Sequence, residues 1–375
     1  MPDHEHHRAD RVAEGARRFG TPRLSAEQAM AGAPASWFPP GVFESLPAPT
    51  GKPPYRLDLA GVIGAASIAK LEASGSVSFH SIGDSGGVKD PQPQQSVAAA
   101  LEADLAAFPA AFLYHLGDVV YFNGEDSQYY GQFYEPYQHY NLPIFAVPGN
   151  HDGDPLAGTA SLAAFVENFC AAAPALTKEA GDSNRDAMTQ PNVYWTLTTP
   201  FATVVGLYSN VPEGGVVKDD QAAWFVGELG AAARNVPLIA AVHHPLFSLD
   251  AHHGSSPAMQ TLMTNSFAAA GRLPDLILTG HVHDYQRFTW TVGGRSVPVI
   301  VSGAGGYHNL HPMVPGLNPP SPTPNPDVRL EAYHDESFGF LRLSCSAAGI
   351  AGAYVAVSAA ETQQVDTFTL PLQPG

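Results

Sequence analysis

Short apolar runs that alternate with helix-like segments constrain the fold of this chain more than any other feature. The runs are rich in Val, Ile, Leu and Phe, and Gly, Pro or Asn bounds each of them, which is typical of buried strands. They are Val77–Ile82, Ala111–Leu116, Pro143–Val147, Phe201–Tyr208, Val236–Val242, Leu273–Leu278 and Val297–Val301. The segments of helical periodicity are Gln94–Phe108, Asp219–Leu229 and Pro257–Ala270. Strands alternating with helices predict the α/β class with stacked layers.

The chain of 375 residues divides into two parts by pattern. Residues 1–75 lack strong strand patterning and contain many prolines, so we expect a proline-rich N-terminal extension there. Residues 76–375 carry the regular pattern and are predicted to form one domain. The Pro-rich stretch Pro312–Pro326 is expected to be a surface loop, because strand-like segments follow it at Gly339–Cys345 and Ala353–Val357.

Composition excludes several classes of protein. The formal net charge is −17, which disfavours nucleic acid as a partner because an acidic chain gains nothing from contacts with phosphates. No stretch is apolar enough to span a bilayer, and the polar N-terminus does not resemble a signal peptide, so a cytoplasmic protein is expected. The two cysteines, Cys170 and Cys345, form no C-x-x-C pair, although one disulfide between them is conceivable.

Polar motifs follow five of the predicted strands. They are Gly83-Asp84-Ser85-Gly86, Gly117-Asp118-Val119-Val120-Tyr121, Gly149-Asn150-His151-Asp152, His243-His244-Pro245 and Gly280-His281-Val282-His283. Ligand sites of α/β sheets gather outside the carboxyl ends of strands, so these motifs are expected to converge. Carboxylate, amide, imidazole and phenol groups together suit Zn, Mn or Fe. Each motif alone is weak, but the complete set in this order favours a metal site.

These motifs resemble those of the metallophosphoesterase superfamily, and within it the purple acid phosphatases. The resemblance covers roughly residues 76–345 and includes smaller similarities around Gln221, in the turn Gly303–Gly306, and at Tyr285 and Arg287. It implies a layered α-β-β-α sandwich, with residues 76–375 as a metallophosphoesterase catalytic domain.

The resemblance also implies two metal sites that share a ligand. Asp84, Asp118, Tyr121 and His283 would hold the first ion, and Asp118, Asn150, His243 and His281 would hold the second. Asp118 would bridge the ions, since a carboxylate offers two anionic oxygens. Most superfamily members have a histidine where this chain has Gly86, and Tyr121 is placed to supply the missing ligand. A phenolate favours Fe(III) at site one, with Fe, Zn or Mn at site two.

The implied reaction is hydrolysis of a phosphate monoester, with a metal-bound hydroxide attacking phosphorus. His151 would contact the phosphate, and His252 or His253 would protonate the leaving alcohol. Asp152 would orient His151. His80 and His115, which lie inside predicted strands, are interpreted as satisfied core residues or as supports of the ligands.

Two other functions remain open. A phosphodiesterase on the same scaffold would act on nucleotide or phospholipid headgroup diesters, and the segment Ala171–Asn192 could shape its site. A non-catalytic module that binds metal or phosphate is the second. In each case the expected partner is a small-molecule phosphoester or phosphate rather than nucleic acid or membrane, and the oligomeric state stays open.

Overall fold

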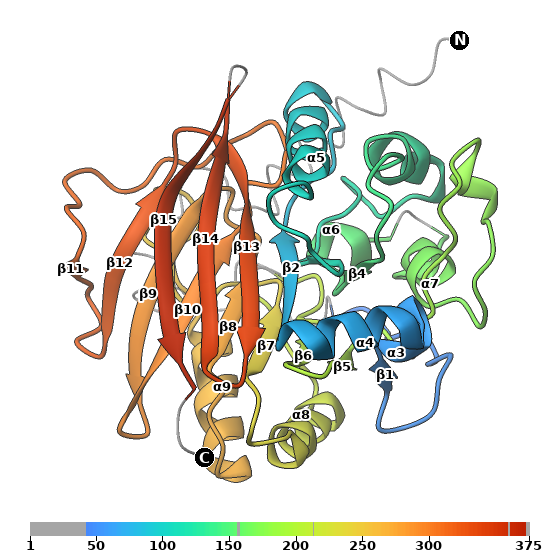
Figure 1. Ribbon diagram of the computed structural model, residues 1–375. Helices are drawn as coiled ribbons and strands as arrows, with labels where there is room; N and C mark the ends of the chain where they lie inside the picture. Colours follow the sequence, from blue (N-terminus) through green and yellow to red (C-terminus); the bar gives the residue numbers. More distant parts are fainter. Residues whose placement is uncertain (1–42, 156–157, 213, 359–360, 373–375) are drawn as a thin grey trace.

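Two stacked β-sheets with helices on their outer faces make up the molecule (Figure 1). The computed structural model describes residues 43–155, 158–212, 214–358 and 361–372. The first half of the predicted extension, residues 1–42, lies outside the described residues. The layered α-β-β-α arrangement expected from the sequence is confirmed.

The larger sheet has parallel strands at its centre, where β6, β7, β8 and β10 lie side by side. Its order is β1 (Arg56–Asp58), β5 (Trp195–Thr198), β6 (Thr203–Leu207), β7 (Leu238–Val242), β8 (Leu276–Thr279), β10 (Arg295–Ser302), β9 (Tyr285–Val292), β12 (Val328–His334) and β11 (Ser321–Pro322).

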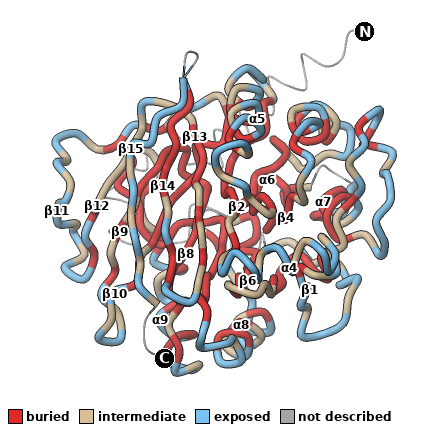
Figure 2. The backbone as a smooth tube through the Cα atoms, in the orientation of Figure 1, coloured by how far each residue is buried: buried red, intermediate tan, exposed pale blue. Residues whose placement is uncertain are grey.

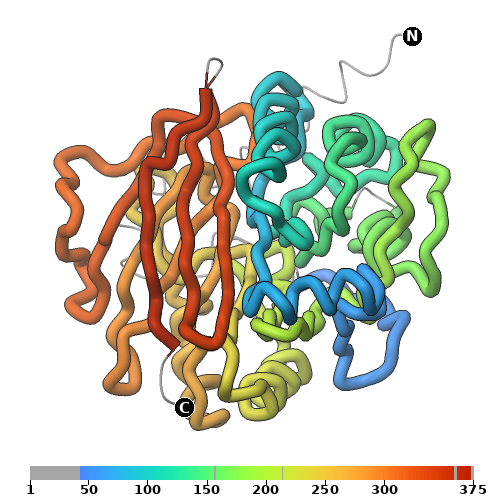
Figure 3. The backbone as a smooth tube through the Cα atoms, in the orientation of Figure 1, coloured from blue at the N-terminus to red at the C-terminus, as the bar shows by residue number. Residues whose placement is uncertain are grey.

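The smaller sheet joins three parallel strands from the first half of the chain to three antiparallel strands from its end. Its order is β15 (Thr362–Pro371), β14 (Gly349–Val357), β13 (Phe338–Ser346), β2 (Ser76–Ile82), β3 (Leu113–His115) and β4 (Ile144–Ala146). Figure 3 shows β2, in blue, beside the red strand β13, with which it pairs in antiparallel register. The other edge of β2 pairs with β3 in parallel register.

Helices cover the outer faces and edges of the sheets. The α-helices are α3 (Ala60–Ile63), α4 (Ala65–Ser74), α5 (Gln92–Asp104), α6 (Asn150–Gly153), α7 (Ala163–Phe169), α8 (Asp219–Ala231) and α9 (Pro257–Ala270). Short 3₁₀ turns occur at Asp126–Gln128 and Lys178–Ala180, and a π-helical turn occurs at Tyr130–Tyr134. Helices α8 and α9 pack on the larger sheet, whereas α5 packs on the smaller one.

The two faces of the central strands are both buried, which explains their unbroken apolar runs (Figure 2). Val204 and Leu278 pack between the sheets with Phe79. Their neighbours Val205 and Ile277 point to the other side, where they pack with residues of α8 and α9. Side chains of a strand alternate between its two faces. One face of each of these central strands therefore packs against the other sheet, and the opposite face packs against helices.

Every strand and helix expected from the sequence is present, with small shifts of its ends. Two expectations gain detail. Residues 43–75 of the predicted extension contain β1, which pairs with β5, as well as α3 and α4. The predicted loop Pro312–Pro326 includes the two-residue strand β11. The domain boundary after residue 75 stays a prediction.

Two further properties concern the described residues alone. Cys170 and Cys345 are both buried and free, so they form no disulfide with each other. Within the described ranges, no helix has the length and apolar character needed to cross a membrane.

A buried ionic network fastens α5 to β13. Arg342 of β13 donates two hydrogen bonds to the carboxylate of Asp104, at the end of α5. His80 Nε2 lies 2.9 Å from the same carboxylate, and its Nδ1 lies 2.9 Å from the hydroxyl of Tyr140. A carboxylate only accepts, so the neutral His80 donates through Nε2 and accepts the tyrosine hydroxyl at Nδ1. The network therefore satisfies all of its buried polar groups.

Replacing Asp104 with Asn is expected to lower the free energy of unfolding by about 2–3 kcal/mol, because Arg342 loses its charged partner. The Arg342 side chain keeps 17% of its surface exposed, which places the cost at the lower end for such pairs. Urea unfolding measures the change. Glu102→Gln, at an exposed position of the same helix, should change stability by less than about 0.5 kcal/mol. An equal loss in both variants would contradict a role for the pair.

The same network predicts the direction of acid unfolding. Burial acts to raise the pKa of Asp104, but hydrogen bonds from His80 and Arg342 outweigh it and lower that pKa. Its stabilising contribution is therefore present above about pH 3.9 and is lost as pH falls through the folded pKa. Burial lowers the pKa of His80, so stability also declines as pH drops below about 6.5, where only the unfolded chain takes up the proton.

Candidate metal centre

The five polar motifs meet where the carboxyl ends of the parallel strands of both sheets face each other. Asp84 follows β2, Asp118 follows β3 and Asn150 begins the helix after β4. His243 directly follows β7, and His281 comes two residues after β8. The smaller sheet thus supplies two carboxylates and an amide, and the larger sheet supplies imidazoles.

Three of these residues adopt left-handed backbone conformations. The φ angles are +58° at Asp84, +54° at Asp118 and +69° at His281. Residues other than glycine seldom adopt such angles, and the strain they carry is concentrated at functional sites. The turns after β2, β3 and β8 therefore hold their side chains in the site at a conformational cost.

Group one, as we name the first cluster, consists of Asp84, Tyr121 and His283. The Tyr121 hydroxyl lies 3.3 Å from Asp84 Oδ1 and 3.4 Å from His283 Nε2. His283 Nε2 lies 3.7 Å from the same carboxylate oxygen. The ligand-type atoms of these three residues, which belong to the predicted site one, therefore lie close together.

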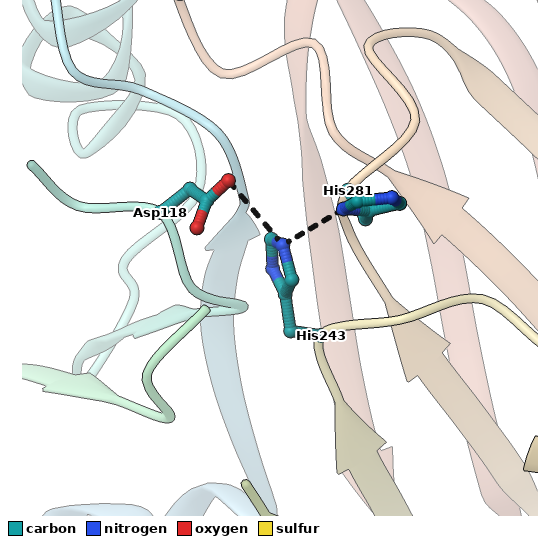
Figure 4. Close-up of side chains that lie close together, drawn as sticks. All are labelled: Asp118, His243 and His281. Atoms are coloured by element: carbon teal, nitrogen blue, oxygen red, sulfur yellow. Dashed lines mark hydrogen bonds and ion pairs between the residues drawn. The ribbon is translucent and has the colours of Figure 1, made fainter. Parts of the chain in front are cut away.

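Group two consists of Asn150, His243 and His281, beside Asp118. Asn150 Oδ1 lies 3.1 Å from both His243 Nε2 and His281 Nδ1, and these two nitrogens are 3.3 Å apart. Asp118 Oδ2 lies 3.4 Å from His243 Nε2, and Figure 4 shows both histidine rings and this carboxylate turned toward one another. His243 Nε2 is also 3.9 Å from Asp84 Oδ1, which places the two groups side by side.

These spacings fit metal ions. Bonds of about 2.0–2.2 Å to one ion leave neighbouring ligand atoms roughly 3.0–3.6 Å apart, which matches group two and nearly matches group one. Asp118 Oδ2 is buried and accepts no hydrogen bond, although a buried carboxylate oxygen without a donor is costly. Asp118, His243 and His281 also satisfy the geometry of a metal-binding cluster. The donor set therefore fits a dinuclear centre.

The outer nitrogens of two histidines are held by the backbone. His243 Nδ1 donates to the carbonyl oxygen of Leu116 at 2.8 Å, and His283 Nδ1 donates to that of Asn309 at 2.8 Å. A carbonyl only accepts, so Nδ1 of each ring carries a proton, and in the neutral ring Nε2 carries the lone pair that a metal needs. The fold thus sets the tautomer of one histidine in each group.

Gly86 explains why Tyr121 can occupy group one. A Cβ at position 86 would collide with Gln132 Oε1 and would lie 2.8 Å from a ring carbon of Tyr121. Gln132, in the π-helical turn, accepts from the Tyr121 backbone N–H at 2.9 Å and donates to the Tyr121 carbonyl at 2.9 Å. The side chains of Tyr121 and Gln132 therefore occupy the space that a side chain at position 86 would need.

Burial and charge control the protonation of these residues. Burial, followed by the carboxylates of Asp84 and Asp118, raises the pKa of Tyr121. The phenol therefore stays protonated unless positive charge enters the site. Burial would lower the pKa of His243, but the carboxylates of Asp118 and Asp84 outweigh it and raise that pKa. A cation held by His243 and Tyr121 would therefore have to displace a proton from each of them.

His151 and His253 also line the centre. His151 donates its backbone N–H to Asp118 Oδ1 at 2.9 Å, and its ring centroid lies 4.5 Å from that of Tyr121. The ring of His253 lies 4.8 Å from that of His281. The ring of His252 lies beside that of His311, with 5.0 Å between their centroids. Of the three histidines predicted to act on the substrate, His151 and His253 therefore lie against residues of the two groups.

Asp152, His244 and His115 support the site. Asp152 accepts hydrogen bonds from the backbone N–H groups of Val119, Val120 and Gly149, which ties together the loops carrying Asp118 and Asn150. The expected orientation of His151 by Asp152 stays a prediction. His244 Nδ1 lies 2.7 Å from Ser209 Oγ, and its ring packs on His281. His115 Nε2 lies 2.8 Å from Ser85 Oγ.

Sequence reasoning missed Tyr307, His311, Gln132 and Asp250. Tyr307 stacks on Tyr121 with ring centroids 4.0 Å apart, and His311 stacks on His283 at 4.2 Å. Both follow the glycine turn Gly303–Gly306, so the polar and aromatic residues after that turn were the available signal.

The comparisons with known proteins support the same fold. Among solved structures, GAP50, the anchor in the inner membrane complex of Plasmodium, aligns with 16% identity over 80% of this chain and 89% of its own, with a TM-score of 0.56. PhoD aligns with 13% identity over 88% of this chain and 72% of its own, with a TM-score of 0.53. A search of curated protein sequences finds no match. At these identities the structural likeness shows the fold alone.

A sequence profile decides the family. The profile of the calcineurin-like phosphoesterases matches residues 81–285, which is more than half of the chain. The match includes all five motifs whole, so it spans every residue of groups one and two. Members of this family are phosphoric ester hydrolases that generally use two metal ions. The chain belongs to the calcineurin-like phosphoesterase family.

Proposed function

We propose that this protein hydrolyses phosphate monoesters at a dinuclear metal centre of the purple acid phosphatase type. The observation that carries the proposal is the pairing of group one, which includes Tyr121, with group two. Fold likeness would not suffice, because one structural neighbour is described as an anchor and one fold can host several functions.

The ligands divide between the two ions as the groups do. Asp84, Tyr121 and His283 would hold the first ion, for which the phenolate favours Fe(III), and group two would hold a second ion, Fe, Zn or Mn. Asp118 Oδ1 accepts the His151 backbone N–H and Oδ2 accepts no hydrogen bond. Asp118 would be the ligand that the two ions share, and its negative charge would help to balance theirs.

The bound ions would neutralise phosphoryl charge and lower the pKa of the attacking water. His151 Nδ1 lies 2.8 Å from the carbonyl oxygen of Phe122, which fixes the ring beside Tyr121. In this place it would contact the phosphate. His253, against His281, is the better placed candidate for protonating the leaving oxygen, and His252 is the alternative.

Hydrolysis of p-nitrophenyl phosphate and of bis(p-nitrophenyl) phosphate tests the proposal. For the metal-loaded protein we expect kcat/KM to be at least about tenfold higher for the monoester, which corresponds to about 1.4 kcal/mol of differential transition-state binding. Both esters release the same chromophore, so each serves as the control for the other. A clear preference for the diester would assign the site to a phosphodiesterase. Phosphate binding without turnover of either ester would favour a non-catalytic module.

A further inference from the structure

A buried carboxylate outside both ligand groups organises the loop that follows β7. Asp250 Oδ2 accepts the backbone N–H groups of His252 and His253, each at 2.9 Å. Its Oδ1 accepts the backbone N–H of Gly254 at 2.9 Å and the Ser248 hydroxyl at 2.7 Å. The carboxylate is fully buried. Four donors from its own loop thus hold Asp250 in one orientation.

This carboxylate also meets the side chain of His253. His253 Nδ1 lies 3.3 Å from Asp250 Oδ2. An ionised carboxylate can only accept, so Nδ1 carries a proton and Nε2 is the nitrogen that can gain or lose one. Burial acts to raise the pKa of Asp250, but the hydrogen bond and charge of His253 outweigh it and keep that pKa low.

Neighbouring rings hold His253 at the edge of group two. Its ring centroid lies 4.8 Å from His281 and 4.7 Å from His311, with which it stacks. His311 in turn stacks on His283 of group one. The His253 side chain keeps only 4% of its surface exposed. The Asp250–His253 pair is therefore fixed directly against His281 of group two and, through His311, against His283 of group one.

We infer that Asp250 is a positioning residue that holds His253 in the tautomer and orientation of the general acid for the leaving alcohol. The inference rests on the proposed function and assigns its protonation step to one histidine. Protonated His253 gives the proton on Nε2 to the leaving oxygen as the P–O bond breaks and its electron pair stays on that oxygen. The imidazolium becomes neutral imidazole, and Nδ1–H remains bonded to Asp250.

The same residues admit a second interpretation, because Asp250, His253 and His311 are close enough to hold a metal ion. Two observations disfavour it. Both Asp250 oxygens already accept hydrogen bonds from the loop. His311 Nδ1 accepts the His283 backbone N–H at 3.2 Å, so neutral His311 carries its proton on Nε2 and has no lone pair left for an ion. The hydrogen-bonded pair therefore explains the cluster better than an ion does.

Leaving-group dependence tests the inference. A nitrophenolate departs without a proton, whereas an alkoxide needs one. In Asp250→Asn, kcat/KM for an alkyl phosphate such as glycerol 2-phosphate should fall about 10- to 100-fold more than that for p-nitrophenyl phosphate. His253→Asn should show at least the same selective loss. Asp250→Asn should add no further selective loss in the His253→Asn background, because the two residues act as a unit.

Ser248→Ala is the matched control. It removes a hydrogen bond from Asp250 Oδ1 but leaves the contact between Oδ2 and His253 Nδ1. Any loss of activity in this variant should be equal for both esters. An equal loss for both esters in Asp250→Asn would overturn the inference. A selective loss that persists in the double variant would do the same. Wild-type protein that hydrolyses neither ester would instead refute the proposed function.

The tautomer of His253 provides a readout independent of activity. With ¹⁵N-labelled histidine, the resonance missing in His253→Asn identifies this ring, and we expect Nδ1 to carry the proton in the wild type. In Asp250→Asn the amide favours the other tautomer. A wild-type ring protonated on Nε2 alone overturns the inference, even if Asp250→Asn fails to fold. The inference is also overturned if metal analysis finds three ions per chain in the wild type and only two in Asp250→Asn.

Discussion

Asp118→Asn should lower kcat/KM for phosphate monoesters by about 10³-fold or more. An amide keeps the size of the side chain and one oxygen, but it removes the negative charge beside His243 Nε2. If Asp118 bridges two ions, its loss weakens both of them, and the ions contribute several kcal/mol of transition-state stabilisation. Each 1.4 kcal/mol or so is worth a factor of ten in rate.

The effect of added metal on the melting temperature is a second test of the role of Asp118. A ligand that binds only the folded chain raises the melting temperature with its concentration, so added metal should stabilise the wild type and stabilise Asp118→Asn far less. Asp186→Asn, at an exposed position, is the control and should behave as the wild type does. Full hydrolysis by metal-loaded Asp118→Asn would show that the centre is assigned to the wrong residues.

Most of the strands that the sequence predicted have both faces buried. Strands β6, β7 and β8 have apolar runs because a sheet covers one face and helices cover the other. Strands β1 and β15 were not predicted. Strand β1 has only three residues, and its hydrogen bonds depend on β5, far away in the chain. Strand β15 lies at a sheet edge and is largely exposed.

The site divides in the same way. Asp84, Asp118 and His281 were predicted because each lies in a short motif just after a predicted strand. That position can be recognised from the sequence without knowledge of the folded structure. Gln132 and Asp250 were not, because their roles come from hydrogen bonds made after the chain has folded. Gln132 lies in a π-helical turn, a feature often found at functional sites but without a recognisable sequence pattern.

Tyr121→Phe is expected to remove the visible absorption of the metal-loaded protein. If Tyr121 binds Fe(III) as a phenolate, the protein as purified should contain iron and show a charge-transfer band. The variant lacks the hydroxyl that lies 3.3 Å from Asp84 Oδ1 and 3.4 Å from His283 Nε2. It should lose the band completely, and hydrolysis should fall by at least about tenfold because an ion has lost a ligand.

Tyr307→Phe is the control that separates ligation from aromatic packing. Tyr307 stacks on Tyr121 with an angle of 21° between the rings, and phenylalanine at either position preserves this contact. Only Tyr121→Phe should lose the band and reduce the iron content. An active wild-type enzyme that is colourless and free of iron would contradict the Fe(III)–phenolate assignment. It would leave Tyr121 as a neutral hydroxyl that hydrogen-bonds to Asp84, as its raised pKa allows, in a phosphoesterase that uses other metals.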